Sequence, residues 1–71
     1  MIYNWIDRKT LNHKIYDLIL GNFHFCIQEF SDKSCAWWIY GNFAHHARSL
    51  DAAEYHVNKY IEDHTIKYYE E

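Results

Sequence analysis

The sequence predicts a small α+β domain in which a three-stranded antiparallel meander packs one face against a single C-terminal amphipathic helix. Three observations predict it: an alternating β-prone run over 22–30, a tryptophan-rich β-prone run over 35–46, and one helical stripe of apolar residues over 49–64. The chain has 71 residues, 49 % of them hydrophobic, no proline and a net charge of −3. This composition is typical of one folded domain and not of a disordered chain.

The helix is predicted by its cap and by its apolar stripe. Ser49 is a good N-cap residue, and Asp51 lies in the first turn, where the helix dipole favours negative charge. One face of the expected helix collects the apolar residues Leu50, Ala53, Val57, Tyr60 and Ile61 together with His64. We expect the helix to span 49–64 and an acidic tail to follow over 65–71.

The two β-prone runs are expected to form a hairpin around a four-residue turn at 31–34. This turn would pair Phe30 with Cys35, and opposed residues share a face of the sheet. The helix-facing side would then carry Phe23, Phe25, Ile27, Trp38 and Tyr40. The open side would carry His24, Cys26, Gln28, Trp37 and Ile39.

Residues 15–20 read either as a strand or as the end of a helix that begins at Thr10 and stops at Gly21. We favour the strand, because the short spacer to 22 suits a meander and a bare two-stranded sheet is marginal in water. The strands would lie at about 15–20, 22–30 and 35–46. Residues 1–14 are expected to form an N-terminal arm, with Ile2, Trp5 and Ile6 packed across an open end of the core.

The cysteines and histidines indicate no site with chemistry of its own. In the expected register Cys26 and Cys35 lie roughly 13 Å apart, too far for a disulfide, so we expect free thiols and a reducing cytoplasm. The six histidines show no zinc-binding spacing, and the sequence lacks a nucleophile motif and a phosphate-binding loop. We therefore expect no metal, no cofactor and no enzymatic activity.

Aromatic residues are the most unusual feature of the composition. Four Phe, three Trp and seven Tyr make up 20 % of the chain. One interpretation is that so small a core needs large side chains; the other is that some rings remain exposed, where Trp and Tyr are enriched at interfaces. We expect exposed rings and a binding surface.

Two surfaces are candidates for a protein partner. The first is the open sheet face, with His24, Gln28 and Trp37, where a Trp can act as a hot spot. The second is the polar face of the helix, which suits a basic partner such as a nucleic-acid-binding subunit. Its residues are Asp51, Glu54, Tyr55, Asn58, Glu62 and Asp63.

Other partners remain as alternatives or are disfavoured. A homodimer could hide the aromatics, and single-stranded nucleic acid could stack on them. Direct nucleic-acid binding is disfavoured because residues 21–50 carry two basic and two acidic residues, and phosphate neutralisation needs an excess of basic ones. No apolar run is long enough to cross a membrane.

The order strand, strand, Trp-rich strand and then Ala-Arg-Ser-Leu-Asp-Ala-Ala-Glu over 47–54, which opens a helix, resembles small phage-encoded βββα accessory proteins. The resemblance covers about 15–64 and concerns architecture and short aromatic motifs. Some such proteins are anti-defence inhibitors, including anti-CRISPR proteins. The resemblance implies a non-catalytic inhibitor of a nucleic-acid-handling defence complex such as CRISPR–Cas, and it transfers no functional residue.

Overall fold

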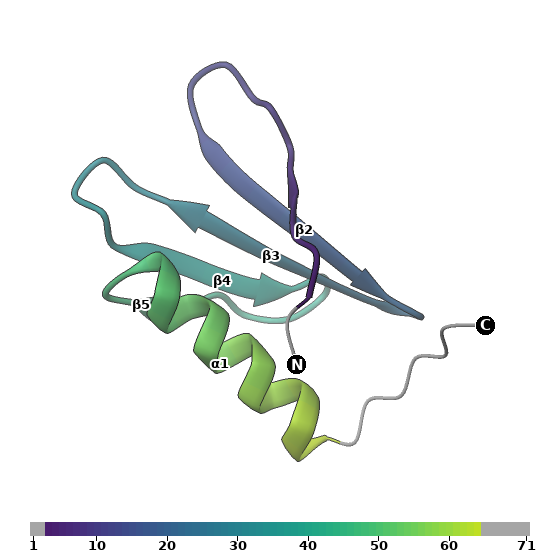
Figure 1. The fold of residues 1–71 in the computed structure, drawn as a ribbon. Coiled ribbons are helices and arrows are strands. Elements are labelled where there is room, and N and C mark those ends of the chain that lie inside the picture. The colour runs from purple at the N-terminus through teal and green to yellow at the C-terminus, as the bar shows by residue number, and fades with distance from the viewer. Residues whose placement is uncertain (1–2, 65–71) are drawn as a thin grey trace.

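A computed structural model of the protein describes residues 3–64, which form one antiparallel sheet with a helix on one of its faces (Figure 1). The sheet order is β1-β2-β3-β4-β5, so each strand lies beside its neighbours in sequence. The elements are β1 Ile6–Asp7, β2 Lys14–Leu20, β3 Phe23–Glu29, β4 Cys35–Ile39, β5 His45–Ala47 and α1 Leu50–Asp63. The α+β class is confirmed, but these residues form five strands where three were expected. The predicted acidic tail, 65–71, lies outside the described residues.

The two additional strands arise at the ends of the expected meander. In the predicted arm, Ile6 and Asp7 pair with β2 as an edge strand. The predicted strand 35–46 is interrupted by a turn, in which Gly41 has φ 90° and the Asn42 N–H donates to the Ile39 carbonyl. The chain reverses there because glycine adopts positive φ without a steric cost. Residues 45–47 therefore return as β5 beside β4.

The prediction that residues 15–20 form a strand is confirmed by β2. It connects to β3 through a two-residue loop, in which Gly21 has φ 58°. Positive φ at the first loop position is the conformation of type II′ hairpin turns, whose twist matches that of the flanking strands. A helix over 15–20 would have lost the seven residue pairs that β2 makes with β3.

The hairpin between β3 and β4 has a different register from the predicted one. The loop contains three residues rather than four: the Phe30 N–H donates to the Ser34 carbonyl, and Lys33 has φ 74°. Phe25 is therefore opposite Ile39, and Ile27 is opposite Trp37. Because a shift of one residue moves every side chain of a strand to the other face, the predicted faces of β4 are wrong.

The core lies between α1 and one face of the sheet. Ser49 caps the helix by accepting a hydrogen bond of 3.1 Å from the Ala52 N–H, and α1 contributes Ala53, Val57 and Ile61 to the core. The sheet contributes Leu18, Leu20, Phe25, Ile27, Cys35, Trp37 and Ile39. The predicted helix is confirmed to within one residue at each end, and His64 is its C-cap. Among residues 3–64, no helix is both long and apolar enough to span a bilayer.

The N-terminal arm reaches the core in part. Tyr3 and Trp5 are half-buried against the core, as expected for Trp5, and Ile2 lies outside the described residues. Ile6 is instead 60 % exposed, because it lies opposite Asp17 and so on the face of the sheet away from α1. The expectation that Ile6 closes the core is therefore wrong.

Candidate protein-binding surface

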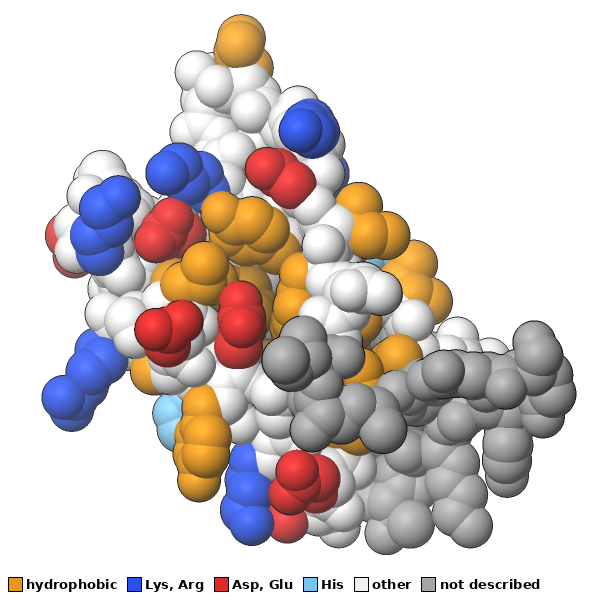
Figure 2. Space-filling model, in the orientation of Figure 1, with side chains coloured by type: hydrophobic (Ala, Val, Ile, Leu, Met, Phe, Trp, Pro, Cys, Tyr) orange, Lys and Arg blue, Asp and Glu red, His pale blue; other side chains and the backbone are white. Residues whose placement is uncertain are grey.

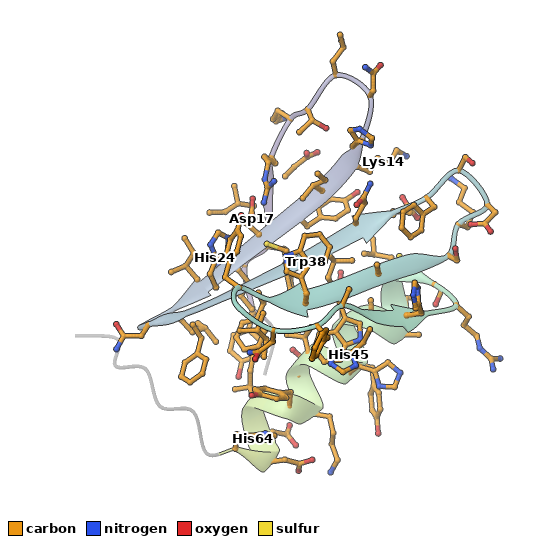
Figure 3. The ribbon with its side chains drawn as sticks, turned by 180° about the vertical axis from the view of Figure 1, so that it is seen from behind. Lys14, Asp17, His24, Trp38, His45 and His64 are labelled. Atoms are coloured by element: carbon orange, nitrogen blue, oxygen red, sulfur yellow. The ribbon has the colours of Figure 1, made fainter. Side chains whose placement is uncertain are left out.

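The sheet has one face that α1 does not cover, which we call the open face (Figure 3). The register assigns its side chains directly, because opposed residues share a face. They are Ile6, Ile15, Asp17, Ile19, His24, Cys26, Gln28, Ala36, Trp38, Tyr40 and His46. The open face thus mixes apolar, aromatic and polar groups on a rigid support.

A row of opposed residues crosses the middle of the open face. Asp17 on β2 is opposite Cys26 on β3, which is opposite Trp38 on β4. Figure 3 shows Asp17, His24 and Trp38 together over these strands. Cys26 is fully buried although no second layer from residues 3–64 covers this face, so neighbouring side chains of the face itself enclose it.

The Asp17 carboxylate is the centre of a hydrogen-bonded group, which we call the Asp17 cluster: Arg8, Asp17, His24 and Cys26. The Arg8 guanidinium binds Asp17 through two nitrogens, with Nε–Oδ2 at 2.9 Å and Nη2–Oδ1 at 2.7 Å. His24 Nε2 lies 2.9 Å from Oδ1, and Cys26 Sγ donates to the same oxygen at 3.1 Å. An ionised carboxylate only accepts, so His24 Nε2 carries a proton and donates a hydrogen bond to Asp17.

The cluster fixes the charge states of Asp17 and Cys26. The hydrogen bonds from Arg8 hold the pKa of the Asp17 carboxyl well below its usual range, against the opposing effect of burial. Burial, followed by the hydrogen bond to Asp17, raises the pKa of the Cys26 thiol to about 12. A nucleophilic cysteine needs a lowered pKa, so the cluster holds Cys26 as a hydrogen-bonded thiol and not as a nucleophile.

Exposed apolar and aromatic groups surround this cluster. Tyr40 is 56 % exposed, and its ring meets the His24 ring edge-on at 4.3 Å between centroids. Ile19 is 60 % exposed, and Trp38 is half-buried. Trp, Tyr and Arg are the residue types that contribute most binding energy at protein interfaces, and all three occur here.

Of the three residues predicted to form the binding surface on the open face, two lie there and one does not. His24 and Gln28 lie on the open face, and the Gln28 amide is 3.3 Å from Nδ1 of His13. Trp37 does not: it is only 7 % exposed and packs on the helix side, stacked on His45 at 4.5 Å. Trp38 takes the place that was predicted for Trp37. Ile39 is likewise in the core, and Tyr40 is on the open face rather than the helix side.

Sequence reasoning missed Arg8 and Asp17 altogether. The positions of both residues depend on the pairing of β1 with β2 and of β2 with β3. The predicted register covered only the hairpin that follows. One signal was available: in the segment His24-Phe25-Cys26, two ligand-type side chains lie two residues apart on a strand and so share a face.

The predicted residues on the polar face of α1 differ in how far they are exposed. Asp51, Tyr55, Glu62 and Asp63 are exposed, with Tyr55 at 64 %, whereas Glu54 and Asn58 are half-buried. Burial raises the pKa of Glu54, and the Asn58 Oδ1 is buried without a hydrogen-bond partner. Asp63 forms an ion pair with Lys59 at 3.4 Å. Figure 2 shows acidic side chains interspersed with Lys and Arg on this side rather than gathered in one patch.

Hollows on the surface are shallow. One of about 260 Å³ lies beside α1, lined by Tyr3, Tyr55, Asn58, Lys59 and Glu62, and another of similar volume lies between Phe43, His45 and Tyr60. Within the described residues, the one group of His, Cys and acidic side chains close enough to hold a metal is Asp17, His24 and Cys26. The sequence matches no known family, and no curated protein or solved structure is significantly similar to the chain.

Proposed function

We propose that the protein is a non-catalytic protein-binding module and that the partner docks on the open face. The observation that carries the proposal is that Trp38 and Tyr40 flank a polar cluster in the middle of a sheet face that α1 leaves uncovered. A sheet normally buries an apolar face against a second layer. Here the partner supplies that layer.

The charges of the open face favour a partner of mainly apolar and aromatic character. Arg8 and Asp17 already neutralise each other through two hydrogen bonds, so neither has a strong need for an opposite charge on the partner. Removing such a partly buried pair from water on binding is costly unless its hydrogen bonds persist, as they do within the cluster. The polar groups therefore set orientation, and the rings supply affinity.

The inhibitor function implied by the resemblance to phage accessory proteins is a narrower form of this proposal. It requires that the partner belong to a nucleic-acid-handling defence complex such as CRISPR–Cas. The exposed Asp51 and Glu62 of α1 lie outside the proposed interface, where their charge would steer a basic subunit of such a complex towards the protein. The free thiols of Cys26 and Cys35 suit a reducing cytoplasm, where such a complex works.

Paired tyrosine variants test which surface binds. Tyr40 on the open face and Tyr55 on α1 have similar exposure, 56 % and 64 %, so each can be changed to Ala at a similar structural cost. The wild-type protein is used to capture its partner from a lysate of the native host, and the partner is then titrated against each variant. Tyr40→Ala should weaken binding roughly 30-fold, equivalent to about 2 kcal/mol, and Tyr55→Ala should leave it unchanged.

Three outcomes contradict the proposal in different ways. Loss of affinity in Tyr55→Ala and in a Glu62→Lys variant, with Tyr40→Ala unaffected, would move the interface to α1. Light scattering at twice the monomer mass, reduced to the monomer by Trp38→Ala, would make the partner a second copy of the chain. Retention on a single-stranded oligonucleotide, lost steeply with added salt, would replace the protein partner by nucleic acid.

A further inference from the structure

We propose that Asp17, His24 and Cys26 form a binding site for Zn²⁺, and that the Arg8 guanidinium holds the position of the metal when no metal is bound. The three residues offer one oxygen, one nitrogen and one sulfur, and these atoms lie within 4.8 Å of one another. Zn²⁺ accepts this mixture of donors in tetrahedral sites. The argument for this site does not use the proposed protein partner, although the site lies on the open face, where that partner would dock.

Two of the three separations between donor atoms are close to those of a metal centre, and the third, between His24 and Cys26, is within 4.8 Å. Asp17 Oδ1 lies 2.9 Å from His24 Nε2 and 3.1 Å from Cys26 Sγ. Tetrahedral coordination with ordinary zinc–ligand lengths needs about 3.3 Å between oxygen and nitrogen and about 3.6 Å between oxygen and sulfur. The ligands therefore need to move apart by only about 0.5 Å for these two pairs. Their strands fix the arrangement, since Asp17 and Cys26 are directly opposed and His24 shares their face.

Arg8 marks where a cation is stabilised. Its Nη2 is 2.7 Å from Asp17 Oδ1 and 3.6 Å from Cys26 Sγ, so one positively charged group already contacts two of the three ligands. Arg8 follows a two-residue edge strand whose residues are both exposed, and its own side chain is 35 % exposed. Little packing opposes its displacement. When the metal displaces Arg8 Nη2 from Asp17 Oδ1, Arg8 Nε can still donate a hydrogen bond to Asp17 Oδ2. A hydrogen bond of this kind from outside the metal centre orients a metal-binding carboxylate.

The solvent reaches the site past two of the ligands. The side chains of Asp17 and His24 are 15 % and 29 % exposed, and Cys26 lies beneath them. Binding forms a Zn–S bond and releases the Cys26 thiol proton to the solvent, and His24 binds through Nε2 after its proton moves to Nδ1 or is lost. Three protein ligands leave the fourth tetrahedral position for water.

Cobalt titration under reducing conditions tests the proposal without any partner. Co²⁺ added to the full chain should produce a thiolate-to-cobalt charge-transfer band and tetrahedral d–d bands, and Zn²⁺ should abolish both. Cys26→Ser should abolish the charge-transfer band and weaken metal binding more than 100-fold, since loss of an outer contact alone costs about 10–100-fold. Cys35→Ser is the matched control, because Cys35 is also a buried free thiol but faces the core.

Two further variants keep the proposal falsifiable if Cys26→Ser unfolds, which circular dichroism would show. His24→Ala removes a half-exposed ligand and should weaken Co²⁺ binding to a similar degree. Arg8→Gln should tighten it by about tenfold, because the competing cation is gone while a hydrogen bond to Asp17 can remain. Absence of the charge-transfer band in the wild type, its loss in Cys35→Ser instead of Cys26→Ser, or weaker binding in Arg8→Gln would each overturn the proposal.

Discussion

The two faces of the sheet are built from the same strands but bury their side chains by different means. On the side of α1, large apolar groups such as Phe25, Ile27 and Trp37 are buried against the helix. On the open face, the buried residues are the small Cys26 and Ala36, and the larger side chains remain partly exposed. A face without a second layer can enclose small groups only, so its large rings are left available to a partner.

The forces that order the two faces also differ. Apolar packing is non-directional and scales with the area removed from water. The open face is ordered instead by the hydrogen bonds of the Asp17 cluster, which require fixed distances and angles. The helix-covered face therefore supplies most of the stability, and the open face supplies a polar pattern of defined geometry. Three experiments address this division.

The largest expected effect separates the two neighbouring tryptophans. Trp37→Ala should lower the free energy of unfolding by about 3–5 kcal/mol, because it leaves a cavity in the core. Trp38→Ala should lower the free energy of unfolding by about half of that value or less, because the Trp38 side chain is half-buried and its removal leaves no enclosed cavity. Urea denaturation followed by circular dichroism measures both values.

The milder pair Trp37→Phe and Trp38→Phe preserves this test if Trp37→Ala does not fold. A domain of this length has a total stability of only about 4–10 kcal/mol, so that outcome is realistic. The order of the two effects should be the same as in the Ala pair. Equal losses, or a larger loss at Trp38, would show that the two faces are assigned the wrong way round.

A smaller effect is expected from removing the charge of Asp17 in metal-free protein. Asp17→Asn should destabilise the fold by about 2–3 kcal/mol at neutral pH, because Arg8 loses its bidentate partner at a site where the carboxylate is only 15 % exposed. Asp63→Asn is the control: its ion pair with Lys59 is more than half exposed and should contribute about 0.5 kcal/mol or less.

The Asp17 contribution also has a defined pH dependence. Its pKa is lower in the folded than in the unfolded state, so the stabilisation is complete above the unfolded value of about 3.9 and is lost as the pH falls further towards the folded value. The difference in unfolding free energy between wild type and Asp17→Asn should therefore shrink below about pH 4. A difference that stays constant down to pH 2 would show that the charge of Asp17 does not stabilise the fold.

The features that the sequence predicted correctly depend on local signals. Ser49 and the apolar stripe to Ile61 determine α1 within one stretch of chain, and Gly21 determines the turn before β3. The Asp17 cluster depends on two strand pairings, β1 with β2 and β2 with β3, which bring Arg8 to Cys26. No local periodicity encodes such pairings, so the cluster could be found only after the register was known.

The wrong assignment of the tryptophans has a single cause, the length of the loop between β3 and β4. Trp37 and Trp38 are identical neighbours, so hydrophobic patterning cannot say which of them faces the core. The loop length decides, and it depends on Lys33 adopting positive φ, a conformation that lysine does not favour. The turn chemistry of all four residues 31–34 predicted a four-residue turn, whereas the structure has a three-residue loop.

The smallest expected effect tests that loop directly. Lys33→Gly should raise the free energy of unfolding by about 0.5–1 kcal/mol, because a side chain at positive φ costs about 1–2 kcal/mol and the greater freedom of glycine in the unfolded chain offsets part of it. Lys33→Val should lower stability by about 1 kcal/mol or more, since β-branched residues fit this conformation worst. Chemical denaturation of both variants beside wild type measures the two shifts. If valine were tolerated and glycine destabilised the fold, Lys33 would not adopt this conformation, and the register that places Trp38 on the open face would be wrong.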